Sequence, residues 1–344
     1  MDIEIKECPL VTFAVFAYNQ ERFIGEAVEG AFAQTYSPLE IILSDDCSTD
    51  GTFEIMKRMA ASYHGAHKVV LNRNAANLGI GGHVAKVFAT MSGCYVVFAA
   101  GDDVSEANRT SAVVEAFLAD SSRKAVFSDM AIITEEGLTK DKHARCWPSE
   151  FGEPELLDLA PTGGGVGAGA TYAYAKEVGT WPWPFPEYIL NDDRLLPWRA
   201  ALLGSIGHIP RPLVRYRLTR AGLSRATPLL KLVGIAKDQH LDELQHTLAA
   251  AVRDRRVSHR TARQAMNLVR RSRAHLYWRL ATINRRNGPY CFCLRVFQGA
   301  CWWWIRRHWV GRVVKRALCS PSLLFLLCRR IAGRVCNRAL RPST

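Results

Sequence analysis

The chain has 344 residues, of which 48% are hydrophobic and 22% are charged, as in an ordinary globular protein with one large or two small domains. The net charge of +13 is distributed unevenly. Residues 251–344 hold 22 Lys/Arg and one acidic residue, whereas residues 1–250 hold 23 Lys/Arg and 31 acidic residues. The acidic-to-neutral body and the basic C-terminal region therefore need separate explanations.

The ten cysteines do not have the pattern of a disulfide scaffold or a zinc site, because none forms a C-x-x-C pair. Free thiols in a reducing cytosol are expected instead. The opening segment MDIEIKECPL does not resemble a secretory signal. No window contains the ~18 to 20 apolar residues that a membrane-spanning helix needs.

Strand-like runs and helical periodicity alternate through the first hundred residues. Each apolar run is followed by a polar loop and then by apolar residues at helical spacing. We expect strands at residues 11–16, 39–43, 68–71 and 95–98, and helices beginning near residues 21, 53 and 84. This order predicts an α/β fold with a doubly wound, mostly parallel sheet, because parallel strands need right-handed crossovers.

Polar residues follow these strands where parallel strands end together. Tyr18 follows the first strand, Asp46 the second and Gly101-Asp102-Asp103 the fourth. Polar loops at one edge are typical of a nucleotide crevice. Paired carboxylates suit a hard divalent cation that keeps positions free for phosphate. The same Gly-Asp-Asp sequence also suits an ordinary turn.

A strand pair with a turn at Glu136-Gly137 is expected next, followed by a glycine-dense stretch at residues 163–170. The G-x-G-x-x-A match inside it lacks a preceding strand and a following helix, so we interpret the stretch as a loop over a site. Asp192 and Asp193 lie at a predicted helix start, with Pro197 in its first turn. Capping is therefore the alternative to a catalytic role for this pair.

Residues 9–224 resemble family 2 glycosyltransferases, a family with the GT-A (Rossmann-like) fold. The resemblance rests on six segments in the family's order, namely PLVTFAVFAYNQERFIGEAVEGAFAQTY, LEIILSDDCSTDGT, NAANLGIGGHVAKVF, GDDV, NDDRLLPWR and VRYRLTRAGLS. It implies a catalytic domain at residues 1–225. The donor half would extend to about residue 135, and the acceptor half would cover about residues 136–225.

The resemblance also implies how the donor is bound. Tyr18 would stack on the nucleotide base, and Asp46 would accept a hydrogen bond from that base. Asn77 would lie near the ribose and phosphates. Asp102 would lie near the donor sugar and ribose, and Asp103 would bind the Mg²⁺ or Mn²⁺ ion that bridges the diphosphate.

On the acceptor side, the resemblance implies that Asp193 is the general base. We prefer it to Asp192 because its spacing to Arg199 fits the family pattern better. Trp181, Trp183 and Asp192 are assigned to the acceptor region.

The chain departs from the family pattern at two positions. Thr219 stands where many members carry a histidine. The segment NAANLGIGGHVAKVF corresponds to the family's third loop, in which many members carry an arginine that contacts phosphate. In this chain His83 or Lys86 would have to supply that contact.

The C-terminal region is interpreted as a helical extension at residues 226–287 and a basic, Trp/Arg-rich amphipathic tail at residues 288–344. Such a tail suits an anionic membrane surface. A solvated helical hairpin and nucleic-acid binding are the alternatives, but no nucleic-acid-binding motif is present, so no nucleic-acid partner is expected. We therefore expect a cytoplasmic protein that associates peripherally with the inner face of the cell membrane.

Together these features predict an inverting, metal-dependent glycosyltransferase of surface polysaccharide biosynthesis. It would move a sugar from a nucleotide diphosphate sugar, with UDP as the default, to a hydroxyl of a saccharide or lipid-linked acceptor. The alternatives are a membrane-associated scaffold with a decayed transferase domain and a nucleotidyltransferase. The latter normally needs a glycine-rich, basic phosphate loop after the first strand, where this chain has AYNQERFIG.

Overall fold

The computed structural model describes residues 8–148, 152–162, 164–219 and 230–284, with side chains described over residues 239–272 in the last of these ranges. The chain divides into two units, residues 1–270 and 271–344. The arrangement that follows is that of the first unit.

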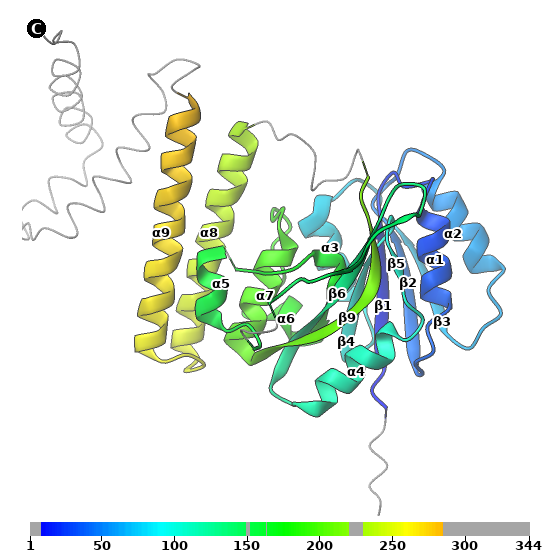
Figure 1. The fold of residues 1–344 in the computed structure, drawn as a ribbon, viewed down its shortest axis with the longest axis horizontal. Helices are drawn as coiled ribbons and strands as arrows, with labels where there is room; N and C mark the ends of the chain where they lie inside the picture. The colour runs from blue at the N-terminus through cyan, green and yellow to red at the C-terminus, as the bar shows by residue number, and fades with distance from the viewer. Residues whose placement is uncertain (1–7, 149–151, 163, 220–229, 285–344) are drawn as a thin grey trace, which may run out of the picture. The chain divides into compact units, whose positions relative to one another are not determined.

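One nine-stranded sheet organises this unit (Figure 1). Its order is β3-β2-β1-β4-β8-β6-β9-β5, and β7 pairs with β6 outside this path. The strands β1 to β4 run parallel, as predicted, whereas β8 is antiparallel to both of its neighbours. The strands are β1 (Val11–Ala17), β2 (Leu39–Asp45), β3 (Lys68–Arg73), β4 (Tyr95–Ala100), β5 (Val104–Ser105), β6 (Arg123–Ile133), β7 (Thr139–Ala144), β8 (Tyr172–Ala175) and β9 (Ser205–Arg217).

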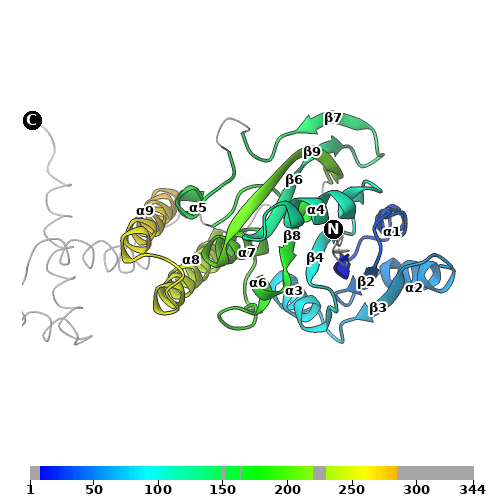
Figure 2. The same cartoon turned by 90° about the horizontal axis from the view of Figure 1, so that it is seen from below.

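Helices cover both faces of the sheet (Figures 1 and 2). Residues of α1, α2 and α4 share one buried cluster with the sheet, while α3, α6 and α7 contact one another. The helices are α1 (Ile24–Phe32), α2 (Thr52–Ala61), α3 (Gly79–Thr90), α4 (Arg109–Ala119), α5 (Leu156–Thr162), α6 (Lys176–Thr180), α7 (Asp192–Leu203), α8 (Leu230–Arg253) and α9 (His259–Asn284), and Gly169–Thr171 forms a 3-10 turn, η2.

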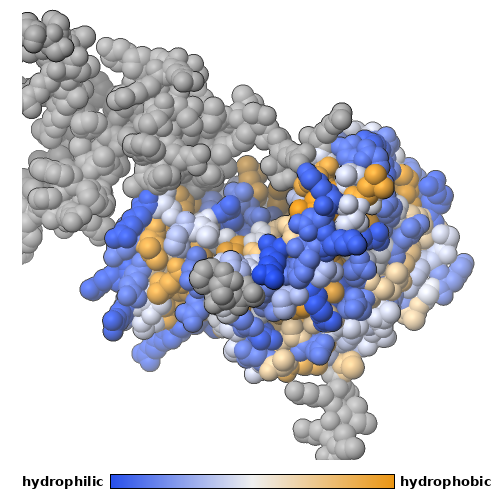
Figure 3. All heavy atoms as spheres, in the orientation of Figure 1, coloured by the Kyte–Doolittle hydropathy of each residue, from blue (hydrophilic) through white to orange (hydrophobic). Residues whose placement is uncertain are grey.

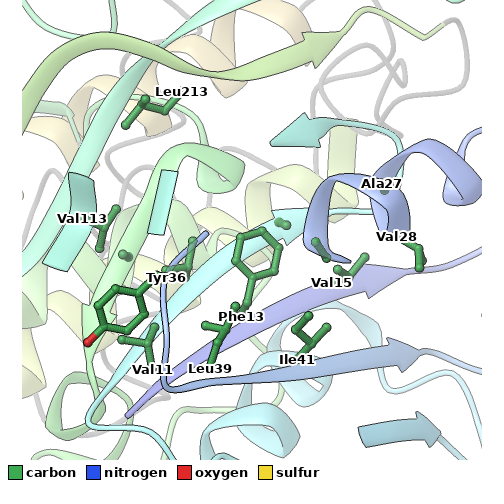
Figure 4. Close-up of a cluster of buried hydrophobic side chains, with 14 of the residues drawn as sticks. Val11, Phe13, Val15, Ala27, Val28, Tyr36, Leu39, Ile41, Val113 and Leu213 are labelled. Atoms are coloured by element: carbon green, nitrogen blue, oxygen red, sulfur yellow. The ribbon is translucent and has the colours of Figure 1, made fainter. Parts of the chain in front are cut away.

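The core beneath α1 follows from the alternation of side chains along β1. Val11, Phe13 and Val15 point to the same face, and each is fully buried (Figure 4). They pack with Val28 of α1 and Ile41 of β2. Burial of each such side chain contributes about 1.5 to 3 kcal/mol, so this cluster holds the parallel strands under the site.

On the opposite face, α3 is held closely by residues that come much later in the chain. A Cβ atom built on Gly81 would lie 2.5 to 2.7 Å from the carbonyl oxygens of Pro186, Glu187 and Ile189. Because a real side chain could not approach so closely, the glycine at this position of α3 allows the segment at residues 186–189 to pass over the helix.

Helix α8, in the predicted helical extension, packs on α7 through Trp198. Its indole Nε1 donates hydrogen bonds at 3.1 Å to the Leu244 carbonyl and at 3.1 Å to Thr247 Oγ1, both on α8. The sequence-based domain boundary near residue 225 falls at residues 220–229, outside the described residues. The helix expected at residues 195–203 is confirmed as α7, but it begins earlier, at Asp192, so that Pro197 lies in its second turn and not in the first.

Surface character gives no sign of a membrane span in the part of the chain that the structure describes. None of its helices is long and apolar enough to cross a bilayer. On the face seen in Figure 3, hydrophilic residues are interspersed with smaller apolar areas.

Candidate active site

The loops that follow β1 and β2 are tied together by hydrogen bonds. Asn19 has a left-handed φ of 53°, and its Oδ1 accepts the Thr49 amide at 2.8 Å. Its own amide donates to Ser48 Oγ at 2.9 Å. Tyr18, directly before it, remains 45% exposed. An accessible ring on an ordered loop is available for stacking, which is the role predicted for Tyr18.

Asp46 organises the third loop. Its buried carboxylate accepts hydrogen bonds from Asn74 Nδ2 at 2.8 Å and from the amides of Leu78 at 2.9 Å and Gly79 at 3.0 Å. Asn77 is exposed, and its Oδ1 accepts the Gly79 amide at 2.9 Å. A carboxylate has about four lone-pair positions, so these bonds leave room for the predicted base contact.

Asp103 has one carboxylate oxygen that is satisfied and one that is not. Its Oδ1 accepts the Arg217 amide at 2.8 Å. Its Oδ2 is buried and has no hydrogen-bond partner among the described residues. Burial, followed by the neighbouring charge of Asp102, raises the pKa of Asp103 well above its usual range. A buried oxygen without a donor is costly unless something positive reaches it, so this carboxylate fits a cation ligand.

The guanidinium groups of two buried arginines offset the charge of the Asp102–Asp103 pair without bonding to its side-chain oxygens. Arg217 donates from Nε to the carbonyl of Asp102 at 2.9 Å and from Nη2 to Glu26 at 2.8 Å. Arg109 lowers the pKa of Asp103 through its charge, while its guanidinium donates hydrogen bonds to Ser105 and to the Ala170 carbonyl. The carboxylates therefore keep lone pairs available for a metal ion.

A metal ion here would depend on few protein ligands. Within the described ranges, no group of three or more His, Cys, Asp or Glu residues could hold one. Asp103 would be the protein ligand, with diphosphate oxygens and water completing the oxygen-rich shell that Mg²⁺ or Mn²⁺ prefers. Thr219, at the family's histidine position, is buried two residues beyond Arg217.

The second acid pair forms the first turn of α7. Asp192 and Asp193 are partly buried, and burial raises the pKa of both. The pKa of Asp192 reaches about 7, because the Asp193 charge adds to the effect of burial. A raised pKa makes a carboxylate a stronger proton acceptor, as a general base needs to be.

The glycine-dense stretch packs directly against this pair. A Cβ atom built on Gly169 would lie 3.5 Å from Asp192 Oδ2 and 3.5 Å from Asp193 Cβ, and one on Gly165 would collide with the Asp193 carbonyl. Gly164 has a left-handed φ of 108°. Glycine is therefore needed both for the backbone shape and for the close approach to α7.

Asp192→Asn is expected to raise the melting temperature, and to raise it more at pH 8 than at pH 5. Because the pKa of Asp192 is about 7 in the fold and roughly 3.9 when unfolded, ionisation costs stability increasingly as pH rises between these values. We expect about 3 °C or more at pH 8, measured by calorimetry. Exposed Asp141→Asn is the control, and a pH-independent gain would contradict the assigned cause.

The two tryptophans predicted for the acceptor region contact other parts of the unit. Trp181 Nε1 donates to Asp254 Oδ2 at 3.2 Å, beyond the end of α8. The carbonyl of Trp183 accepts Arg199 Nη1 at 3.1 Å, in the middle of α7. Tyr188, 52% exposed, lies closer in sequence to the acid pair, and its hydroxyl bonds to Glu243 of α8.

His83 does not face solvent. It is buried on α3, its Nε2 is 2.7 Å from Ser44 Oγ, and its ring meets Phe16 edge-on at 5.1 Å. Burial lowers its pKa. Of the two residues considered for the phosphate contact, Lys86 is the exposed one.

Sequence reasoning missed Arg109 and did not assign a role to Arg217. Arg217 carried a signal, because it belongs to the closing tyrosine-arginine segment of the family resemblance. Arg109 carried none, since its partners come from β5 and η2. The buried Asp129, which pairs with His143 at 2.7 Å and His208 at 2.9 Å, likewise lacked a sequence signal.

The strand order, with acidic residues at the carboxyl edge of the parallel strands, is the GT-A type of architecture. Residues 12–178 match the model of Glycosyl transferase family 2, which confirms the family resemblance predicted from the sequence. The chain is 31% identical over 149 residues to the putative glycosyltransferase EpsE of Bacillus subtilis, covering 43% of this chain and 51% of that protein. It is 29% identical over 136 residues to the putative teichuronic acid biosynthesis glycosyltransferase TuaG of the same organism, covering 39% and 52%.

The chain thus spans about half the length of these curated relatives. Among solved structures, it is similar to the mannosyltransferase PcManGT of Pyrobaculum calidifontis in complex with GDP-Man and Mn²⁺. The TM-score is 0.52 at 18% identity, covering 93% of this chain and 86% of that one. This likeness supports the predicted GT-A fold.

Proposed function

We propose that the chain is an inverting, metal-dependent glycosyltransferase that uses a nucleotide diphosphate sugar. The observation that carries the proposal is the buried Oδ2 of Asp103, which no described residue bonds, at the carboxyl edge of the parallel strands. A second acid pair of raised pKa accompanies it. The similar archaeal mannosyltransferase is described with GDP-Man and Mn²⁺. UDP is retained as the default nucleotide on the family resemblance alone.

In the proposed reaction, Asp193 accepts the proton of an acceptor hydroxyl. The acceptor oxygen bonds to the anomeric carbon from the face opposite the leaving group, which inverts its configuration. The bond between that carbon and the diphosphate oxygen breaks, and its electron pair leaves with the nucleoside diphosphate. Asp103 would hold the divalent ion, whose charge supplies stabilisation of the leaving diphosphate when bound.

A saccharide or lipid-linked acceptor in surface polysaccharide synthesis is the proposed second substrate. The name of TuaG supports this class, because it refers to teichuronic acid biosynthesis. A thermal-shift screen of nucleotide sugars with Mn²⁺ tests the donor, since a ligand at 100 times its Kd stabilises by about 2.7 kcal/mol. A shift with one nucleotide sugar is expected, whereas no shift with any would favour the non-catalytic scaffold.

The rival nucleotidyltransferase makes a different product. It would join a nucleoside triphosphate to a sugar phosphate and release pyrophosphate, whereas the proposed enzyme releases a nucleoside diphosphate. Phosphorus NMR of the products separates the two activities.

We also propose peripheral association with the inner face of the cell membrane. The tail at residues 288–344 lies outside the described residues. Helix α9, which precedes it in the sequence, contains no acidic residue. Arg260, Arg263 and Arg271 of α9 are exposed. Arginines near an anionic bilayer contribute about 1 kcal/mol each.

The double variant Arg260→Glu and Arg263→Glu is expected to weaken binding to phosphatidylserine vesicles by about tenfold or more in sedimentation assays. Exposed Arg58→Glu on α2 is the matched control. Equal binding to purely phosphatidylcholine vesicles, or no loss in the double variant, would contradict an electrostatic contact through α9.

A further inference from the structure

Arg109 links the loop of the first acid pair to the acceptor half. It is the first residue of α4, and its side chain is 0% exposed. Nη1 donates to Ser105 Oγ at 2.9 Å, and Nη2 donates to the Ala170 carbonyl at 2.6 Å. Ser105 lies two residues after Asp103 and Ala170 lies in η2, so one guanidinium bridges two segments that are far apart in sequence.

The turn that Arg109 holds is the one that packs on the second acid pair. Gly169, next to Ala170, has its Cβ position 3.5 Å from both Asp192 Oδ2 and Asp193 Cβ. A second bond from Nη2 reaches the carbonyl of Tyr172 at 3.4 Å, at the start of β8. A continuous set of contacts therefore leads from β5, which follows Asp103, to α7, which carries the proposed base Asp193.

A charged side chain at position 109 is not needed to fill the space between these segments. Burial lowers the pKa of Arg109 to about 9, and the nearby charge of Asp103 opposes that shift. Its Nε has no hydrogen-bond partner among the described residues. Burying a guanidinium is expensive, and an apolar side chain would fill the same space at lower cost. The planar fork, however, can donate to two segments at once in fixed geometry.

We propose that Arg109 is a positioning residue for sugar transfer. By joining Ser105 to the η2 turn, it sets the distance between the carboxylate that would hold the metal ion and the base, Asp193. The acceptor oxygen then meets the anomeric carbon at attack distance. This inference rests on the proposed glycosyl transfer.

The test compares Arg109→Lys with the wild-type chain in transfer kinetics, donor hydrolysis and thermal stability. Lysine keeps the charge but loses the fork. We expect kcat for transfer to fall about 10²-fold, as for a misplacement of about 1 Å, with donor KM unchanged. Donor hydrolysis should fall less, because a small, mobile water molecule tolerates a changed spacing better than a bound saccharide. The ratio of hydrolysis to transfer should therefore rise.

Ser105→Ala provides a milder variant in case Arg109→Lys fails to fold. It removes the Nη1 bond and leaves the buried charge, and it should shift the hydrolysis-to-transfer ratio in the same direction by several-fold. Ser128→Ala, another buried serine, and Arg123→Lys, at the first residue of β6, are the matched controls. Neither should change the ratio.

Two results would overturn the role of Arg109. One is a folded Arg109→Lys variant with wild-type kcat and ratio. The other is a loss of activity in both variants that is fully explained by a smaller fraction of folded protein. A wild-type chain that transfers no sugar would instead overturn the proposed function itself.

Discussion

Asp193→Asn is expected to lower kcat for sugar transfer by about 10²- to 10⁴-fold while donor affinity is retained. An amide cannot accept the proton of the acceptor hydroxyl, and the reaction has no other proton acceptor in the proposed mechanism. Donor affinity should persist because the predicted donor contacts come from the strand-end loops of the donor half. Single-turnover kinetics and calorimetric titration of the nucleotide sugar measure the two effects separately.

Helix capping makes the opposite prediction for the same variant. A carboxylate in the first turn of a helix stabilises it by about 0.3 to 1 kcal/mol through the helix dipole. If Asp193 only caps α7, the variant would lose a little stability and keep its kcat. Asp158→Asn in the first turn of α5 is the control for the pure capping effect. Retained turnover by Asp193→Asn would remove the base assignment.

Asp103→Asn is expected to abolish the Mn²⁺-dependent part of donor binding and to lower kcat by about 10²- to 10³-fold. The buried Oδ2 is the atom that would bind the ion, and an amide nitrogen in its place cannot. Without metal, the variant should be at least as stable as the wild-type chain, because burial and Asp102 raise the pKa of the Asp103 carboxyl well above its usual range. Stability and function should therefore change in opposite directions.

Calorimetric donor titration with and without Mn²⁺ measures this loss, and melting curves in EDTA measure the metal-free stability. The wild-type chain should lose transfer activity in EDTA and regain it when Mn²⁺ or Mg²⁺ is added. Undiminished wild-type turnover in the chelator would contradict a metal role for Asp103.

The parallel half of the sheet was predictable because its buried strands form continuous apolar runs in the sequence. Runs of apolar residues predicted strands at residues 11–16 and 39–43, where β1 and β2 lie, since strands covered on both faces are continuously apolar. Helical spacing predicted α1 to α3 in the same way. The strand-end positions of Tyr18, Asp46 and the Asp102–Asp103 pair follow from this register.

The acceptor half was less predictable because its pairing joins distant segments. Strand β9 runs from Ser205 to Arg217, although Pro210 and Pro212 obscure its first half in the sequence. A bulge accommodates this stretch, with Pro212 opposite Asp129 of β6. Helix α4 was missed because polar residues at its start are buried by remote partners. Thr110, for example, donates to Gln34 at 2.7 Å from Oγ1.

The order of strands and helices in the parallel half, the acid pairs and the family resemblance could be predicted, because they depend on periodicity and on neighbours along the chain. Which charged groups meet could not be predicted in this way. In the folded chain, Oδ2 of Asp103 is buried with no donor among the described residues, and the glycine-dense stretch packs on Asp193. The buried Arg109 connects the two regions. Such contacts arise between segments that meet only when the sheet forms, and no local pattern encodes them.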